Sequence, residues 1–213
     1  MNKILLFSLF ALFSLQLQAQ QKAVTETGDE VILYEDGTWT YVDEEAADAK
    51  EIPLNPETFT KPKSSSFLLK SKTVENGIYL NPKKWIFKKS TDNPDAEYEF
   101  QMKEGDLYGM LITEKIEIPL ETLRGIALMN GQSVSPDLRV VNEEYRMVNG
   151  KKVLHLQMNG TLQGIKFSYY GYYYSDEGGT TQFITYTSQM LLEEYTDEAD
   201  ELLNGLVSLL EDE

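Results

Sequence analysis

The chain has 213 residues, with 19 Lys and Arg against 35 Asp and Glu, so its formal net charge is −16. It contains no Cys and a single His, which excludes disulfides, thiolate metal sites and cysteine nucleophiles. Any His-dependent catalytic site would rest on that one residue. The acidic balance argues against nucleic acid or an anionic membrane surface as a partner, because like charges repel.

Residues 1–19 have the pattern of a secretory signal peptide. Lys3 supplies a positive charge, an apolar stretch runs from Ile4 to Leu15, and Ala19 offers a small residue before a cleavage site at Gln20. The stretch is shorter than the roughly 20 residues that a spanning helix needs, and no later segment is apolar enough to span. We therefore expect an exported chain, secreted or periplasmic, with no membrane span after cleavage.

Residues 20–45 predict an N-terminal β-hairpin. The β-rich runs 31–34 and 38–42 flank Asp36-Gly37, a strong hairpin signal. An isolated hairpin is marginal in water, so this one should dock on the chain or on a partner. The stretch 27–39 also resembles a short element near the N-terminus of many secreted Bacteroidota proteins, a resemblance that implies lineage more than activity.

Residues 46–66 have the composition of a linker. Charged residues lead into Pro53, Pro56 and Pro62, and three serines follow at 64–66. Low hydrophobicity combined with Pro and charge predicts a flexible segment, because such a chain cannot offset the entropy lost on ordering.

Residues 67–213 are expected to form one α+β domain, a twisted antiparallel sheet of about six or seven strands packed with two or more helices. The turn residues Asn149-Gly150, Gly160 and Gly178-Gly179 predict an antiparallel meander for the last four strands. Helices are expected over 120–129 and from Thr196 to about Leu210. The predicted strands are 73–80, 97–103, 107–115, 139–148, 151–160, 162–175 and 180–187.

The domain has a recognisable outline. The segment Asn76-Gly77-Ile78-Tyr79-Leu80-Asn81-Pro82-Lys83-Lys84-Trp85 resembles the Gly-aromatic-x-aliphatic-x-Pro-x-x-Trp opening of the Mog1/PsbP-like fold. Tyr173-Tyr174, the run 183–187 and Tyr195 with the C-terminal helix are similar to the ending of that fold. The resemblance implies a binding or assembly role, since such domains are mostly non-catalytic accessory modules without a common catalytic residue set.

The most unusual local feature is a tyrosine-rich strand over 165–174. Alternation places Lys166, Tyr170, Tyr172 and Tyr174 on one face and a set expected to be core on the other. We take these four residues as the candidate ligand-binding site, because Tyr offers apolar area with a polar tip. The alternative is that the hairpin, a loop or a helix covers this face.

The remaining candidates indicate no chemistry. His155 lies in a strand without a nucleophile motif around it, so we expect it to be inert. The acidic stretch 92–97 is interpreted as a turn rather than a Ca²⁺ loop, because Tyr98 stands where an EF-hand needs Gly.

The sequence thus predicts a non-enzymatic binding or accessory module of the cell envelope. Its expected ligand is a protein, peptide or glycan, with no cofactor, metal or nucleic acid. Two alternatives remain open: a carboxylate-dependent envelope hydrolase, and a purely structural subunit of an envelope assembly.

Overall fold

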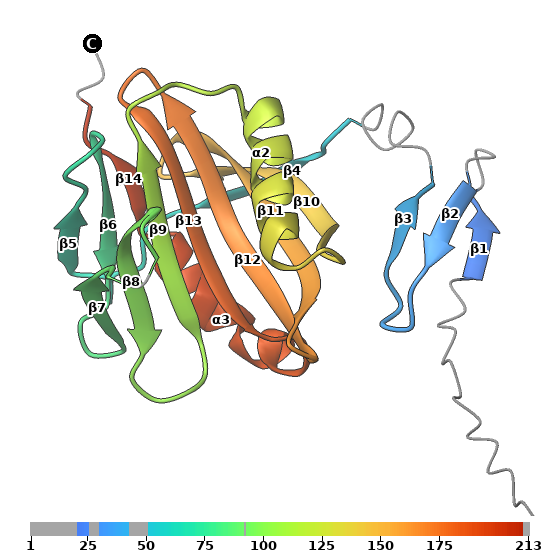
Figure 1. Cartoon of the computed structure of the whole chain (residues 1–213). Helices are drawn as coiled ribbons and strands as arrows, with labels where there is room; N and C mark the ends of the chain where they lie inside the picture. The colour runs from blue at the N-terminus through green and yellow to red at the C-terminus, as the bar shows by residue number, and fades with distance from the viewer. Residues whose placement is uncertain (1–20, 26–29, 43–50, 92, 211–213) are drawn as a thin grey trace, which may run out of the picture.

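A computed structural model describes residues 21–25, 30–42, 51–91 and 93–210. Three layers make up its main body (Figure 1). One helix lies on one face of a large twisted sheet, and a second helix with a small sheet lies on the other. This is an α+β architecture.

The central layer is an eight-stranded sheet with the order β4-β10-β11-β12-β13-β9-β8-β7. β4 runs parallel to β10, and the other neighbours are antiparallel. The strands are β4 (Leu54–Phe59), β7 (Trp85–Lys89), β8 (Ala96–Met102), β9 (Tyr108–Glu114), β10 (Arg139–Val148), β11 (Lys151–Leu162), β12 (Ile165–Asp176) and β13 (Gly179–Ser188).

The expected meander is confirmed as β10, β11, β12 and β13 in consecutive antiparallel order. Asn149 and Gly150 form its first turn with φ of 49° and 83°, a conformation that Asn and Gly tolerate best. Its second turn differs from the prediction, because Gly160 lies inside β11 and Gln163 and Gly164 form the turn.

Two smaller sheets complete the strands. β1 (Gln21–Val24), β2 (Glu30–Leu33) and β3 (Trp39–Tyr41) form an N-terminal antiparallel sheet. The expected hairpin is its β2–β3 unit, with Gly37 at φ 81° in the turn. β5 (Phe67–Lys70), β6 (Asn76–Leu80) and β14 (Leu206–Ser208) form the other sheet, in the order β14-β6-β5.

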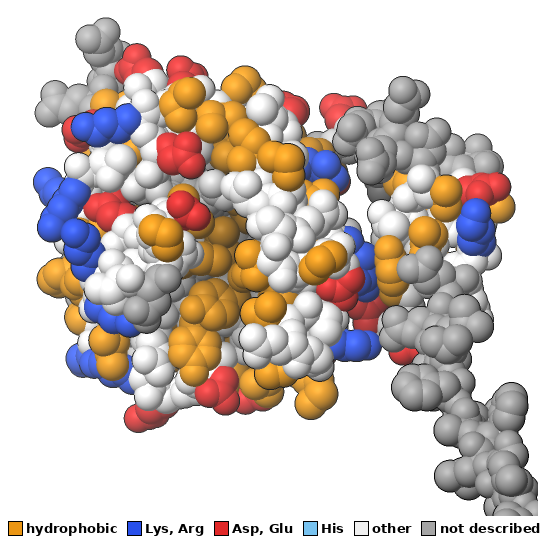
Figure 2. Space-filling view, viewed as in Figure 1, with side chains coloured by type: hydrophobic (Ala, Val, Ile, Leu, Met, Phe, Trp, Pro, Cys, Tyr) orange, Lys and Arg blue, Asp and Glu red, His pale blue; other side chains and the backbone are white. Residues whose placement is uncertain are grey.

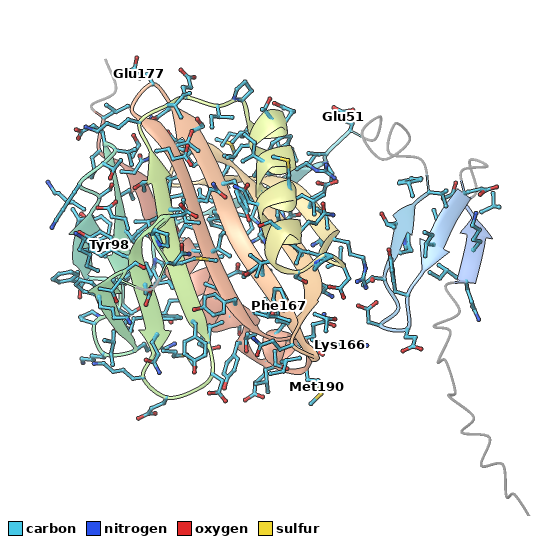
Figure 3. The ribbon with its side chains drawn as sticks, viewed as in Figure 1. Glu51, Tyr98, Lys166, Phe167, Glu177 and Met190 are labelled. Atoms are coloured by element: carbon cyan, nitrogen blue, oxygen red, sulfur yellow. The ribbon has the colours of Figure 1, made fainter. Side chains whose placement is uncertain are left out.

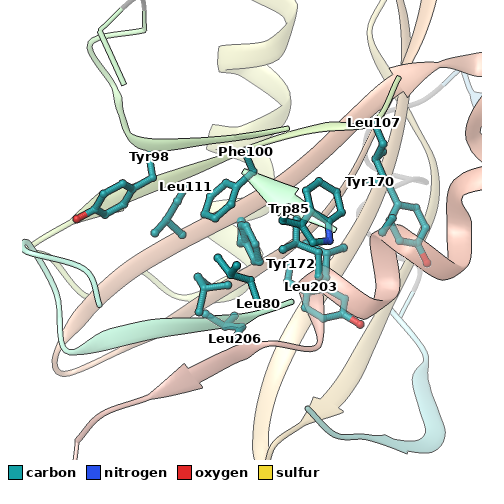
Figure 4. Close-up of a cluster of buried hydrophobic side chains, with 14 of the residues drawn as sticks. Leu80, Trp85, Tyr98, Phe100, Leu107, Leu111, Tyr170, Tyr172, Leu203 and Leu206 are labelled. Atoms are coloured by element: carbon teal, nitrogen blue, oxygen red, sulfur yellow. The ribbon is translucent and has the colours of Figure 1, made fainter. Parts of the chain in front are cut away.

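Two helices cover opposite faces of the central sheet. α2 (Leu120–Val134) packs on β10, β11 and β12, and its face of the sheet is called the α2 side. α3 (Leu192–Leu203), preceded by the 3₁₀ turn Gln189–Leu191, packs on β12 and β13 from behind, on the α3 side (Figure 1). The α3 side holds the larger core cluster, which includes the β5–β6–β14 sheet (Figure 4). No helix in the described ranges has the length and apolar character needed to cross a membrane.

The expected linker is wrong from Leu54 onward. Leu54–Phe59 forms β4, an edge strand that pairs with β10 through Tyr145 and Val148. Pro56 is compatible with this position because an edge strand leaves backbone donors unpaired on one side. Residues 46–50 lie outside the described residues.

The C-terminal helix differs from its prediction at both ends. Thr196 is inside α3 rather than at its N-cap, and its hydroxyl donates to the Leu192 carbonyl at 2.8 Å. The helix stops before Gly205. The backbone of Gly205 approaches Tyr79 so closely that an added Cβ would lie 1.8 Å from the Tyr79 backbone carbonyl oxygen. Apolar residues at helical spacing continue beyond the helix to Leu206, because β14 packs in the same core cluster as α3.

Candidate functional site

β12 carries aromatic residues to both sides of the central sheet. Tyr170, Tyr172 and Tyr174 point to the α3 side, while Phe167 and Tyr169 point to the α2 side. Because successive residues of a strand point to opposite faces, neighbours such as Tyr169 and Tyr170 belong to different sets. What covers each side therefore decides what each set is able to contact.

The α3-side tyrosines are buried, which goes against their assignment as a candidate ligand-binding site. Tyr170, Tyr172 and Tyr174 are 5%, 0% and 5% exposed, and they belong to the larger core cluster beside α3 (Figure 4). Lys166 is exposed near the end of the strand and does not join them (Figure 3). The structure has the alternative arrangement, in which a helix, α3, covers this face.

Each of these buried hydroxyls has a hydrogen-bond partner. Tyr170 donates to Asp200 Oδ1 at 2.9 Å, and Tyr172 donates to Asn204 Oδ1 at 2.9 Å, so both fasten the sheet to α3 or to the residue just after it. Tyr174 donates to Asp176 Oδ2 at 2.7 Å. Burial raises the pKa of the Tyr170 and Tyr172 hydroxyls, which keeps them neutral donors at ordinary pH.

Arg146 is the centre of this buried network. Its Nε donates to Glu144 Oε1 at 2.5 Å, and its Nη1 donates to Asp200 Oδ1 and to the Tyr172 hydroxyl, both at 3.0 Å. Nη2 lies 3.3 Å from the Tyr170 hydroxyl. Because side chains of the protein already engage all three guanidinium nitrogens, this cluster holds α3 on the sheet and offers little to a ligand.

His155 is fully buried beside the same network. Its ring lies 4.4 Å from the Tyr170 ring, and neither ring nitrogen has a hydrogen-bond partner within the described residues. Burial, together with the Arg146 charge, lowers the His155 pKa well below 6.5, so the ring is neutral. The structure thus places His155 in β11 as a neutral, buried ring.

The α2 side carries a second tyrosine set, which the sequence did not single out. Tyr169, Tyr186 and Tyr108 are directly paired across β12, β13 and β9, and they are half-buried. We call these three residues the open tyrosine row. The Tyr108 and Tyr186 rings stack at 5.6 Å, and the Tyr169 ring meets Tyr186 edge-on at 6.1 Å.

The open tyrosine row continues into an apolar border. Phe167 meets Tyr169 edge-on at 4.9 Å, and the strongly exposed Ile165 and Met190 lie at the same end of β12. Figure 3 shows Phe167 and Met190 at this end of the sheet. Figure 2 shows apolar side chains gathered in a hollow between α2 and the β8–β9 region. α2 thus leaves part of its own side of the sheet uncovered.

The hydroxyls of the open tyrosine row have no hydrogen-bond partner in the described part of the chain, whereas the α3-side hydroxyls do. Burial raises the pKa of Tyr169 and Tyr186, so both stay protonated and able to donate. Unpartnered, partly exposed tyrosine tips beside apolar area are the groups that recognise a partner surface. The row is therefore the better candidate site.

Nothing in the described ranges groups three or more His, Asp or Glu side chains as metal ligands. In the acidic stretch, Asn93 Oδ1 accepts from the Asp95 amide at 3.0 Å, as in a local turn. The Glu97 carboxylate accepts from Ser71, Thr113 and the Lys72 amide. Asp92 lies outside the described residues.

Comparison with known proteins adds information on the fold. No family model matches the chain, and no curated protein matches it. The solution structure of cyanobacterial PsbP (CyanoP) from Synechocystis sp. PCC 6803 covers 69% of this chain and 94% of its own, with 13% identity and a TM-score of 0.51.

Two further solved structures show weaker similarity. PA94 of Pseudomonas aeruginosa, a protein of unknown function and putative regulator, covers 66% of this chain and 95% of its own, with 10% identity and a TM-score of 0.43. LpqN of Mycobacterium tuberculosis, involved in cell envelope biogenesis, covers 72% and 85%, with 11% identity and a TM-score of 0.34. The likeness to CyanoP shows that the matched 69% of this chain adopts a PsbP-like α+β fold.

Proposed function

We propose that the chain is an exported, non-catalytic accessory module of the cell envelope that binds a polypeptide through the open tyrosine row. The observation that carries the proposal is the row itself: three tyrosines in direct register, on an uncovered part of the sheet, whose hydroxyls lack partners within the described residues. Export is supported by the signal-peptide pattern of residues 1–19, which lie outside the described residues.

The ring geometry favours a polypeptide over a glycan. Sugar rings bind best on an aromatic face that is open to solvent, but the Tyr108 and Tyr186 rings stack on one another with an interplanar angle of 21°. Because stacking closes the facing sides of these two rings, we infer that their edges and hydroxyls are the groups left for contact, beside the exposed Gln101 on the neighbouring strand. Edges and hydroxyls suit the mixed apolar and amide surface of a peptide.

The alternative of a carboxylate-dependent hydrolase needs two acids in a cleft, one of them with a raised pKa. The described carboxyl groups with a shifted pKa are all shifted downward. Partial burial raises the pKa of Asp36, Asp137 and Glu201, but the hydrogen bonds that they accept lower it by more. Hydrogen bonds also lower the pKa of Glu99 and Glu121. This pattern supports the non-catalytic proposal.

The test is selection of binders from a random-peptide phage library on the mature chain, residues 20–213, followed by affinity measurement with the selected peptide. We expect Tyr169→Ala with Tyr186→Ala to abolish binding, because both remove apolar area and hydroxyls from the row. Tyr79→Ala is the matched control, since Tyr79 is half-buried but lies in the β5–β6–β14 sheet. Equal binding by all variants, or binding only on a glycan array, would overturn the polypeptide proposal.

Mass spectrometry of the chain recovered from the envelope fraction of its producing cell tests export. A mature N-terminus at Gln20 is the expected result. A chain that keeps Met1 in the cytosol would contradict it.

A further inference from the structure

The lysines of this acidic chain are concentrated in one stretch. Residues 61–103 carry nine Lys and five acidic residues, while the rest of the chain carries ten basic and thirty acidic residues. The stretch is thus net positive within a chain of charge −16. Five of these lysines are exposed on β5, on β7 and in the segments next to them, and we call them the basic edge: Lys70, Lys72, Lys83, Lys88 and Lys89.

The fold brings these lysines to a single border of the molecule. β7 is the last strand of the central sheet, and β5 is the last strand of the β14-β6-β5 sheet. The two strands meet through Phe67 and Phe87, whose ring centroids are 5.4 Å apart. Figure 2 shows Lys and Arg side chains gathered along this border, over β5 and β7 as placed in Figure 1.

Most of the basic edge is not neutralised by the protein. Lys88 forms an ion pair with Glu99 at 2.9 Å, but Lys70, Lys72, Lys83 and Lys89 have no acidic partner in the described part of the chain. The nearby Glu97 carboxylate is occupied by Ser71, Thr113 and the Lys72 amide. Among the described residues, Glu75 is exposed between β5 and β6, and Asp95 is exposed in the turn between β7 and β8.

Exposed apolar side chains stand among the lysines. Phe67 is 43% exposed on β5, and Ile86 is 51% exposed on β7. Lysines around exposed aromatic and aliphatic side chains form the combination that binds an anionic bilayer, where apolar groups enter the headgroup region and lysines attract the lipid charges. The local charge decides this interaction, because at physiological salt charges act over a distance of only about 8 Å.

We propose that the basic edge docks the protein on an anionic lipid surface. The inference does not use the open tyrosine row, although the two surfaces adjoin: Ile86 lies in direct register with Tyr108 through Gln101. This proposal revises the expectation that the net negative charge keeps the chain away from an anionic membrane. When the basic edge touches the bilayer, salt screens the repulsion between the lipids and the acidic residues elsewhere in the chain. An acidic polypeptide would match the lysines but would leave the exposed Phe67 and Ile86 unexplained.

The test is co-sedimentation of the mature chain with vesicles of phosphatidylcholine alone or mixed with about one third phosphatidylglycerol. Binding to the anionic vesicles only, and its loss at high salt, is the expected result. Each lysine contributes roughly fivefold to the partition coefficient, so Lys72→Glu with Lys89→Glu should lower it at least about 25-fold. Lys115→Glu with Lys152→Glu changes the total charge equally outside the basic edge and should bind like the wild type.

A third variant, Phe67→Ser with Ile86→Ser, should weaken binding while leaving its salt dependence in place. Equal losses for the two charge variants, or no vesicle binding by the wild type, would overturn the proposal. Binding to polyglutamate but not to anionic vesicles would assign the edge to an acidic polypeptide and would also overturn it. In these cases the lysines would serve to protect two sheet edges from pairing with other chains.

Discussion

The two sides of β12 carry the same residue type with opposite consequences. On the α3 side, Tyr170 and Tyr172 are buried, and their hydroxyls tie the sheet to Arg146, Asp200 and Asn204. On the α2 side, Tyr169 is half-buried and its hydroxyl has no partner in the described ranges. Side-chain chemistry does not distinguish these tyrosines. The difference lies in the helices. α3 covers the tyrosines on its side, so these stabilise the fold, whereas α2 covers its side only in part and leaves tyrosines there available for contact.

The largest expected effect comes from the centre of the closed side. Arg146→Met leaves Glu144 and Asp200 without their cation in a buried setting, so we expect a loss of about 3–5 kcal/mol in the free energy of unfolding. Arg124→Met is the matched control on the α2 side. Arg124 forms two hydrogen bonds to Glu143 and is more exposed than Arg146, so the loss should be smaller, about 1–2 kcal/mol. Urea denaturation measures both values. Similar losses for the two variants would mean that the sides do not differ as described.

The second effect is a pH dependence from His155. The folded-state pKa of this buried ring lies below its unfolded value, so the unfolded chain takes up a proton that the folded chain does not. The stabilising contribution is therefore complete above pH 6.5 and is lost as the pH falls below it. Between pH 7 and pH 5 the loss should reach about 2 kcal/mol.

Urea denaturation across this pH range, for the wild type and for His155→Phe, measures the effect. The variant keeps a ring beside Tyr170 and should lose the dependence above pH 5. A wild-type stability that is flat from pH 7 to pH 5 would contradict the burial of a neutral imidazole.

The third effect separates neighbouring tyrosines directly. Tyr170→Phe removes a hydroxyl that bonds Asp200 and Arg146, so we expect the free energy of unfolding to fall by about 1–2 kcal/mol. Tyr169→Phe removes a hydroxyl without a partner in the described ranges and should change it by less than about 0.5 kcal/mol. Thermal and urea denaturation of the two variants check this order, and a reversed order would break the comparison.

The smallest expected effect concerns the N-terminal sheet. Arg139 Nη2 lies 2.7 Å from Asp36 Oδ2, and the guanidinium stacks on the Tyr34 ring at 3.6 Å. Arg139→Ala should release β1–β3 from the end of β10 while lowering the stability of the main body by at most about 1 kcal/mol. Hydrogen exchange should then speed up in residues 30–42 alone. Unchanged exchange there would show that Arg139 does not hold this sheet.

Local patterns in the sequence were sufficient for much of the fold. The Asn149-Gly150 turn and the alternating runs around it predict the meander, because turn residues and side-chain period act over a few residues. β4 was missed because its pairing with β10 joins segments about 90 residues apart, and Pro56 with its charged neighbours resembles a linker. The end of α3 was missed because Leu206 continues the helical spacing while belonging to a strand.

The tyrosines that the sequence predicts as a candidate site lie on the covered side of β12, and the reason is related. Alternation correctly divides the strand into two faces, one containing Tyr169 and the other Tyr170, but both faces are rich in aromatics. Which face is covered depends on where α2 and α3 pack. The partners that complete the open tyrosine row, Tyr108 and Tyr186, come from other strands, and their pairing with Tyr169 is a property of the sheet register.

The most direct test of the account is the affinity of a peptide selected on the mature chain for Tyr169→Phe compared with Tyr170→Phe. Loss of one hydrogen bond from the binding face should weaken the Tyr169→Phe complex up to about tenfold. Tyr170→Phe should bind like the wild type, because its hydroxyl is buried under α3. Weaker binding by Tyr170→Phe, with Tyr169→Phe unchanged, would contradict the account and return the site to the buried side of the sheet.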